Sequence, residues 1–176
     1  MLKRLLFFLL ICSFAKTVLA QESVDEARLK AAFIYNFTKY IDWGTASDEN
    51  NFVIGVLGSS LVTQSLQEIA STNTVANKKI VIKIFSKPSE IDNCDILFIP
   101  QKNSFSLQSV LDHVGKGVLT ISEEEGFARQ GTAFNFVIKN DKLKFEANLK
   151  AINSAGLKAG SQLLKLATIV NGDKKE

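Results

Sequence analysis

Hydrophobic side chains first recur at helical spacing just after Ser23, which forms a capping box with Glu26. This arrangement predicts a helix that begins at Ser23 and runs to about Ile41. One side of the helix is apolar and holds Ala27, Ala31, Ile34, Phe37 and Ile41. Phe33 and Tyr40 widen this stripe beyond the width that a simple surface helix needs.

The next part of the chain alternates between short apolar runs and amphipathic stretches. The runs 52–57, 80–85, 96–99 and 118–121 are typical of buried strands, and the first is continuous enough to be buried on both faces. Between them, Ser59 or Ser60 is positioned to cap a helix that carries Val62, Leu66 and Ile69. A later helix carries Leu107, Leu111 and Val114 and is expected to end at Gly115.

The pattern changes after residue 122. Residues 123–131 form an acidic loop with glycines, and strands at 132–138 and 142–149 are joined by the turn Asn140-Asp141. On the second strand Leu143, Phe145, Ala147 and Leu149 predict a buried face, while Lys144, Glu146 and Asn148 lie on the polar face. Asn148 or Asn153 is a candidate cap for the turn that follows. A last helix holds Leu163, Leu164, Ala167 and Val170 and is expected to end at Asn171-Gly172.

This order of elements predicts an α/β fold with three layers. Strands that alternate with helices favour a mainly parallel sheet, and the late hairpin adds an antiparallel C-terminal pair at one side. Neither an internal repeat nor a linker interrupts the pattern. We therefore expect residues 21–176 to form a single domain.

The first twenty residues have the layout of a secretory signal peptide. Lys3 and Arg4 precede an apolar stretch from Leu5 to Phe14, and small residues lead to a cleavage site after Ala20. A membrane anchor is less favoured because the apolar stretch is short, and a lipoprotein signal is less favoured because the large Ile11 precedes Cys12. We expect an exported protein that begins at Gln21, and a periplasmic location follows from the resemblance below.

Removal of the signal changes the charge and the cysteine content. The chain has 21 basic and 18 acidic residues, but three of the basic residues lie in the signal. The remainder therefore has no net charge, and its charge gives no argument for nucleic-acid binding. Only Cys94 remains, so no disulfide can form within the chain. Its apolar neighbours favour a buried, inert thiol over a redox sensor.

Groups that could perform chemistry are sparse. The segment from Gly55 to Ser60 lies between a strand and a helix, where phosphates often bind. It has neither the lysine of a P-loop nor the third glycine of a dinucleotide-binding motif, so a plain turn is favoured. His113 is the only histidine and is expected on the exposed side of its helix. The acidic run from Glu123 to Glu125 has no calcium-loop spacing and is expected to be solvated. The sequence predicts no catalytic residue, metal site or cofactor, and a binding protein is favoured over an enzyme.

Aromatic residues next to predicted loops are the better candidates. Trp43 follows the first helix and Phe127 lies in the glycine-containing loop, and large apolar groups at such places often anchor a partner protein. The alternative, that both fold back onto the core, stays open. For a small ligand, the candidates are Gly58, Ser59, Ser60 and Gly126, because they follow the carboxyl ends of strands.

Several collinear segments resemble the YfiR-like family of periplasmic proteins. The run from Lys30 to Trp43 resembles the opening helix of that family, and Ile54–Gly58 and Cys94–Ile99 resemble its first and third strands. Gly117–Ser122, Gly126–Ala128 and Gly131 resemble its central loop, and Phe145–Leu149 and Ala155–Ala167 complete the pattern. The resemblance covers almost all of the chain after the predicted signal.

The resemblance implies a regulatory role. The best-understood member is a dimeric periplasmic repressor that binds the periplasmic sensor domain of an inner-membrane diguanylate cyclase, and it thereby restrains cyclic di-GMP synthesis and biofilm formation. By resemblance we expect a homodimer and a membrane signalling partner here. The alternative is a periplasmic small-molecule binding module that does not repress a cyclase.

This chain departs from that repressor at two points. The repressor is stabilised by disulfides, whereas Cys94 is the only cysteine here after the predicted signal. Lys158 and Gly160 occupy a stretch in which the repressor is expected to carry a more strongly anion-binding pair. Lys158 is therefore a weaker candidate for contact with a ligand.

Overall fold

A computed structural model of the protein describes residues 24–44, 51–101 and 104–171. The described strands are β1 (Ile41–Asp42), β2 (Asn51–Leu57), β3 (Thr74–Val75), β4 (Lys78–Phe85), β5 (Ile96–Ile99), β6 (Leu119–Ser122), β7 (Phe134–Lys139), β8 (Lys142–Asn148), β9 (Lys158–Ala159) and β10 (Thr168–Val170). The helices are an N-terminal helix described over residues 24–37, α2 (Val62–Thr72), the 3₁₀ turn η1 (Pro88–Glu90), α3 (Leu107–Leu111), α4 (Phe127–Gln130), α5 (Leu149–Ser154) and α6 (Ser161–Leu164).

Eight of these strands form one mixed sheet in the order β10-β8-β7-β6-β5-β2-β4-β3. Strands β2, β4, β5, β6 and β7 run parallel to one another, and β8 pairs with β7 in the antiparallel sense. The edge strand β10 is parallel to β8, and β1 pairs with β9 in a separate two-stranded ladder. The prediction of a mainly parallel sheet with an antiparallel C-terminal hairpin is confirmed.

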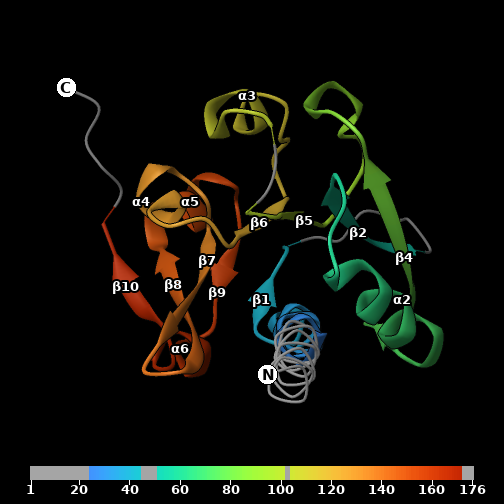
Figure 1. The fold of residues 1–176 in the computed structure, drawn as a ribbon, viewed down its shortest axis with the longest axis horizontal. Helices are drawn as coiled ribbons and strands as arrows, with labels where there is room; N and C mark the ends of the chain where they lie inside the picture. The colour runs from blue at the N-terminus through green and yellow to red at the C-terminus, as the bar shows by residue number, and fades with distance from the viewer. Residues whose placement is uncertain (1–23, 45–50, 102–103, 172–176) are drawn as a thin grey trace, which may run out of the picture.

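The two faces of this sheet bury different hydrophobic clusters. Along β2, Ile54 and Val56 pack toward the N-terminal helix and α2, whereas Val53 and Leu57 pack toward α3. This alternation follows from the two-residue period of a strand, and all four side chains are buried. Figure 1 shows the N-terminal helix and α2 on one side of the sheet and α3 on the other, so the predicted three-layer arrangement is confirmed.

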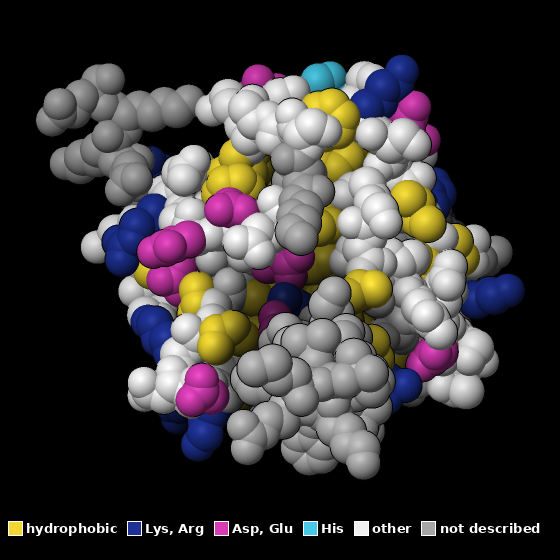
Figure 2. Space-filling view, viewed as in Figure 1, with side chains coloured by type: hydrophobic (Ala, Val, Ile, Leu, Met, Phe, Trp, Pro, Cys, Tyr) yellow, Lys and Arg dark blue, Asp and Glu magenta, His cyan; other side chains and the backbone are white. Residues whose placement is uncertain are grey.

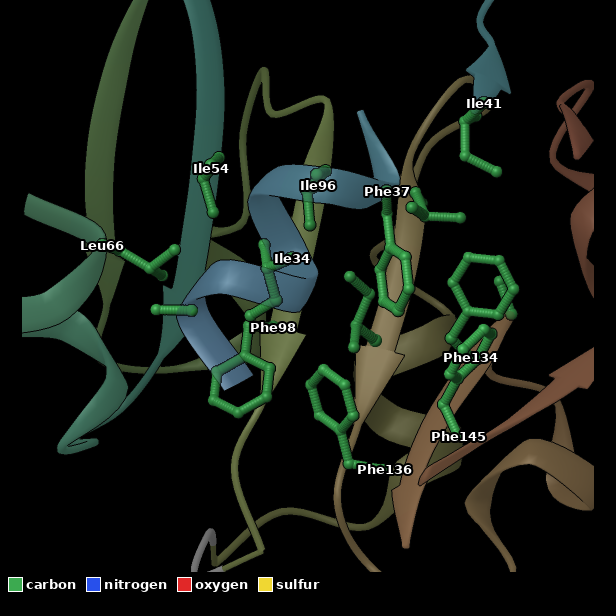
Figure 3. Close-up of a cluster of buried hydrophobic side chains, with 14 of the residues drawn as sticks. Ile34, Phe37, Ile41, Ile54, Leu66, Ile96, Phe98, Phe134, Phe136 and Phe145 are labelled. Atoms are coloured by element: carbon green, nitrogen blue, oxygen red, sulfur yellow. The ribbon is translucent and has the colours of Figure 1, made fainter. Parts of the chain in front are cut away.

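Phenylalanines fill the larger cluster where the N-terminal helix crosses the sheet. The ring centroid of Phe37 lies 4.8 Å from that of Phe134 and 5.0 Å from that of Phe145. Figure 3 shows these rings with Phe136, pointing toward one another from the helix, β7 and β8. Tilted and edge-on contacts of this kind suit the charge distribution of aromatic rings. The wide apolar stripe of the first helix therefore serves a deeply buried contact.

The first helix is shorter than its hydrophobic period predicts. The helix ends at Phe37, a turn covers residues 38–40, and Ile41 belongs to β1 instead of the last helical turn. Ile41 still faces the core, and its partner in the ladder is Ala159. Pairing with a segment more than 100 residues away overrides the local helical pattern. Ser23 and the predicted signal peptide, residues 1–20, lie outside the described residues.

Two further predictions near the C-terminus are wrong. The predicted last helix is only α6, and the segment that contains Val170 forms β10, whose backbone pairs with β8. The predicted loop 123–131 contains the short helix α4, which begins after Gly126 in the left-handed region at φ 82°. Both differences involve four-residue helices or three-residue strands, which periodicity cannot resolve.

The hairpin between β7 and β8 matches its prediction, but one residue of the predicted polar face of β8 does not. Asn140 and Asp141 have φ values of 50° and 57°, as a tight hairpin turn requires. The strand alternation predicts a solvated Asn148, yet this residue is buried. Its Oδ1 accepts the Ala151 N–H at 3.0 Å and so caps α5, as the sequence predicts, while its Nδ2 donates to the Ala128 carbonyl at 2.7 Å. Leu149, predicted on the buried face of the strand, is 38% exposed at the start of α5.

Candidate functional site

The carboxyl ends of the parallel strands form a crevice where the strand order reverses. The chain passes from β2 to β4 on one side of β2 and then to β5 on its other side. In open α/β sheets, ligands bind most often at such a reversal. Here the turn after β2, with Ser59 and Ser60, faces Pro100 and Gln101 after β5 across a cavity of about 390 Å³.

A second cavity of about 670 Å³ adjoins the first over β7 and β8. It includes Gly126 and Arg129 from α4 and its preceding turn, and Lys139 and Glu146 from the two strands. Both cavities share Glu26, Lys30, Gln101 and Glu123. We call the two together the carboxyl-edge crevice. Figure 2 looks onto this edge and shows acidic and basic side chains inside a recess in the middle of the view.

A three-residue ion cluster forms the wall between the two cavities. The Lys30 Nζ lies 2.5 Å from Oε1 of Glu26 and 2.6 Å from Oε2 of Glu123. The other oxygen of Glu123 accepts the Gln101 backbone N–H at 3.0 Å. Glu26 and Lys30 are one helical turn apart, whereas Glu123 follows β6. The cluster therefore ties the N-terminal helix to the edge of the sheet.

The electrostatics of this cluster favour the charged form of Lys30. Burial of the Lys30 ammonium lowers its pKa, but the hydrogen bonds and negative charges of Glu123 and Glu26 outweigh burial, so that the pKa is raised overall. Lys30 therefore stays protonated across the physiological range, and the cluster sets two carboxyl side chains against this one ammonium. It offers fixed charges and hydrogen-bonding groups to a polar ligand.

We expect the Glu123→Gln variant to lose about 1 kcal/mol of stability, because the Lys30 side chain would keep only the more exposed Glu26 as an ionic partner. Urea unfolding of the variant and the wild type measures this difference. Arg28→Gln is the matched control, because Arg28 and Asp25 form a loose pair on the same helix at 3.7 Å with both side chains over 60% exposed. That control should stay within about 0.5 kcal/mol of wild type. Equal losses in the two variants would contradict this account of the cluster.

The structure brings most of the predicted ligand contacts to the crevice and leaves one elsewhere. Ser59 and Ser60 line the smaller cavity, Gly126 lines the larger one, and Gly58 lies in the adjoining turn. Ser60 accepts the Val62 N–H through Oγ at 3.1 Å, but the N-cap position of α2 is held by Leu61, so the predicted serine N-cap is wrong by one residue. Lys158 lies in β9, opposite Asp42, and lines a separate cavity with Tyr40 and Gly160.

The two predicted partner contacts lie at opposite edges of the sheet. Trp43 packs edge-on against Phe52 at the amino end of β2, with ring centroids 5.2 Å apart. Phe127 follows the carboxyl end of β6 and packs against the cluster around α3. Both side chains are half-buried, so each contacts the core and still keeps exposed area. Their role in partner binding stays a prediction.

Three other residues singled out in the sequence have clear positions. His113 is exposed, as predicted, but it lies in the turn after α3, because that helix ends at Leu111 and not at Gly115; its Nδ1 lies 2.9 Å from the Ser109 carbonyl oxygen. The acidic run 123–125 is not uniformly solvated as predicted, because the side chain of Glu123 is only 15% exposed and is ion-paired. Cys94 is buried before β5, as predicted, and the inertness of its thiol stays a prediction.

We expect the Cys94 thiol to react very slowly with iodoacetamide in the folded protein. Burial, together with the negative charge of Asp95, raises the pKa of Cys94 to about 12. A raised pKa leaves less thiolate at any given pH, so at pH 8 the reactive fraction falls about a thousandfold relative to an ordinary thiol. Mass spectrometry of the chain from Gln21 onward, with and without urea, measures the two rates. Equal rates in the two states would contradict a buried, protonated thiol.

Sequence reasoning missed the ion cluster of the crevice. A local signal existed, because Glu26 and Lys30 have the spacing of a helical ion pair. Glu123 is 93 residues away from Lys30, and only the fold brings it into contact. Within the described ranges, no three His, Cys, Asp or Glu side chains are grouped to hold a metal ion. The helices of that same part of the chain include none that is both long and apolar enough to span a membrane.

A comparison with protein families identifies the chain. The model of the YfiR/HmsC-like family matches residues 27–168. The match begins in the N-terminal helix, includes the central strands of the sheet and two members of the ion cluster, Lys30 and Glu123, and ends at the first residue of β10. It agrees with the resemblance found in the sequence. The chain therefore belongs to the YfiR/HmsC-like family.

Proposed function

We propose that this protein is a periplasmic regulator that restrains a membrane signalling enzyme, a diguanylate cyclase, by binding the periplasmic sensor domain of that enzyme. The observation that carries the proposal is membership of the YfiR/HmsC-like family across residues 27–168, which implies a regulatory role. The signal-peptide pattern of residues 1–20 supports export. An exported regulator reaches a cytoplasmic reaction only through a protein that crosses the membrane.

The proposed mechanism is a shift in the population of two states of the partner. A regulator that binds the inactive state more tightly than the active state moves the equilibrium by the difference between the two binding free energies. A hundredfold preference corresponds to about 2.7 kcal/mol, and at saturation it moves two equally populated states to a ratio of about 1:100. This mechanism requires a contact surface on the regulator and no catalytic group.

We place the contact surface at the segment that follows the N-terminal helix. Tyr40 is 40% exposed, Asp42 and Gly44 are exposed, and the half-buried Trp43 lies between them. We call these four residues the amino-edge surface. Aromatic side chains that are partly fixed by the core bind partners at low entropic cost, and Phe52 fixes Trp43 in this way. Phe127 is a second proposed contact, but it lies at the opposite edge and belongs to a separate region.

The proposal is tested by affinity capture from solubilised inner membranes of the cells that produce the protein. The bait is the tagged chain from Gln21 onward. We expect it to enrich a membrane protein that has a periplasmic domain and a cytoplasmic cyclase domain. Failure to enrich any membrane signalling protein above a tag-only control would contradict the proposal.

Variants of the bait test the amino-edge surface separately. Tyr40→Glu and Trp43→Ala should each reduce recovery of the partner, whereas Leu61→Ala, which truncates a 63% exposed leucine in the turn before α2, should not. Circular dichroism confirms that each variant is folded. Full recovery with both amino-edge variants would remove this surface from the proposal.

The family resemblance also supports a homodimer as the active form. Light scattering of the purified chain at micromolar concentration tests this part of the proposal. A mass of two chains is the expected result, and a single-chain mass across the concentration range would contradict it.

A second function, small-molecule sensing without cyclase repression, is favoured by the carboxyl-edge crevice. Its two adjoining cavities lie at the strand reversal where α/β proteins bind ligands. A ligand that binds only the folded protein must raise its unfolding temperature. A thermal-shift screen with nucleotides and amino acids tests this function, and the absence of any shift would count against it.

A further inference from the structure

A separate cavity of about 430 Å³ lies at the other edge of the sheet, near the amino ends of β2, β5 and β6. Its apolar surface comes from Ile41, Trp43, Phe52 and Val75. The segments that supply it are the end of the first helical region, the start of β2, the β3–β4 hairpin and the loops before β5 and β6. We call it the amino-edge cavity. It shares no lining residue with the carboxyl-edge crevice.

The aromatic wall of this cavity is held in place by the fold. The indole of Trp43 packs at 89° against the ring of Phe52, and its Nε1 donates a long hydrogen bond to the Asp95 carbonyl at 3.4 Å. Val53 fixes Asp95 in turn, because its N–H donates to Oδ2 of that residue at 2.6 Å. A wall that is ordered before binding costs a ligand less entropy than one that must be ordered on binding.

The rim of the cavity is polar but balanced in charge. Lys78 and Lys116 contribute two positive charges, and Asp42 and Asp95 contribute two negative charges. Each carboxylate accepts a backbone N–H, Asp42 from Gly44 at 2.8 Å and Asp95 from Val53. The Lys116 Nζ donates to the Ser154 carbonyl at 2.6 Å. Because the rim has two charges of each sign, a ligand with net charge would meet repulsion as well as attraction. An uncharged hydrogen-bonding group would meet no like charge.

We propose that the amino-edge cavity binds a small, uncharged molecule that has an apolar ring and one hydrogen-bonding group. The ring would lie against Trp43, Phe52 and Val75, and the polar group would face the charged rim. The volume falls at the lower end of the range of about 300–1,000 Å³ that ligand pockets occupy. The combination of an apolar floor with a few polar groups is typical of such pockets.

This site goes beyond the proposed regulatory function and does not depend on it. The cavity adjoins the amino-edge surface, since Asp42, Trp43 and Gly44 belong to both. Ligand binding is measured on the purified chain alone, so the result does not depend on whether a membrane partner exists.

The test uses the fact that Trp43 is the only tryptophan in the chain, so its indole N–H gives a single, unambiguous resonance. Benzyl alcohol is titrated into the ¹⁵N-labelled chain from Gln21 onward and followed by two-dimensional ¹H–¹⁵N spectra. We expect saturable shifts of the Trp43 indole resonance and of the backbone amides of Cys94 and Gly117. Half-saturation is expected at about 1 mM, because a molecule of about eight non-hydrogen atoms can bind only weakly. The amides of Ser59 and Gly126, which line the carboxyl-edge crevice, should not shift.

Two controls make the result decisive. Glycerol carries hydroxyl groups but no ring, and it should leave the same resonances unchanged up to the same concentration. A folded Trp43→Ala variant should shift the Cys94 and Gly117 amides with at least tenfold weaker apparent affinity. The proposal is overturned by non-saturable shifts, by equal shifts at Ser59 and Gly126, or by the same shifts with glycerol. If the Trp43→Ala variant does not fold, the wild-type titration still tests the proposal, because the amides of Ser59 and Gly126 serve as internal references.

Discussion

Phe37→Ala is expected to destabilise the protein by about 3–5 kcal/mol, because it removes a large ring from the centre of the core. Phe37 is 1% exposed and contacts the rings of Phe134 and Phe145, so truncation leaves a cavity between the N-terminal helix and the sheet. Such a loss is a large fraction of the stability of an ordinary domain. Chemical denaturation followed by circular dichroism measures the change.

The matched control for Phe37 lies on the same helix. Leu29 is 46% exposed, and Leu29→Ala should change stability by no more than about 0.5 kcal/mol, because little apolar area is lost from the core. A loss below about 1 kcal/mol for Phe37→Ala would mean that the helix does not pack on the sheet through this ring.

Gly55→Ala is expected to destabilise the protein by about 1–3 kcal/mol. Gly55 lies within β2, where a Cβ would come within 2.6 Å of Cε2 in the Phe85 ring and 3.4 Å of Cδ1 in Leu97. Because Phe85 is buried on the α3 side of the sheet, its ring cannot move away without disturbing its neighbours. Thermal and urea unfolding of the purified variant measure the loss.

Gly115→Ala is the control for this glycine. A Cβ at Gly115 would meet no atom within 4 Å, and the backbone of Gly115 is outside the left-handed region that favours glycine. The variant should be neutral or slightly more stable, because alanine restricts the unfolded chain more than glycine does. Similar losses for Gly55→Ala and Gly115→Ala would show that Gly55 is not needed for the approach of Phe85.

Much of the fold is predictable because its signals are local. The buried strand β2 is a continuous apolar run, and the turn Asn140-Asp141 carries residues that tolerate positive φ. Errors arise where distant pairing decides the structure. Ile41 extends a helical stripe in the sequence but pairs with Ala159, and Val170 fits a helical pattern but pairs with Asn148.

The candidate sites are predictable only in part. The rule that ligands bind at the carboxyl ends of parallel strands selects Ser59, Ser60 and Gly126, and the fold places these residues at one crevice; their contact with a ligand stays a prediction. The ion cluster that divides this crevice depends on a contact between Lys30 and Glu123, which no short-range pattern reveals. Trp43 is a candidate from its place after the first helix, but its cavity requires the loops before β5 and β6.

The proposed role of this family member is to restrain cyclic di-GMP synthesis from outside the cytoplasmic membrane. It is tested by the cellular concentration of cyclic di-GMP in cells that lack the protein, compared with cells in which the full chain is restored. We expect a severalfold rise when the protein is absent, and a return to the original level only when the restored chain retains residues 1–20 and is exported. An unchanged or lower cyclic di-GMP concentration in the cells without the protein would contradict the proposed role.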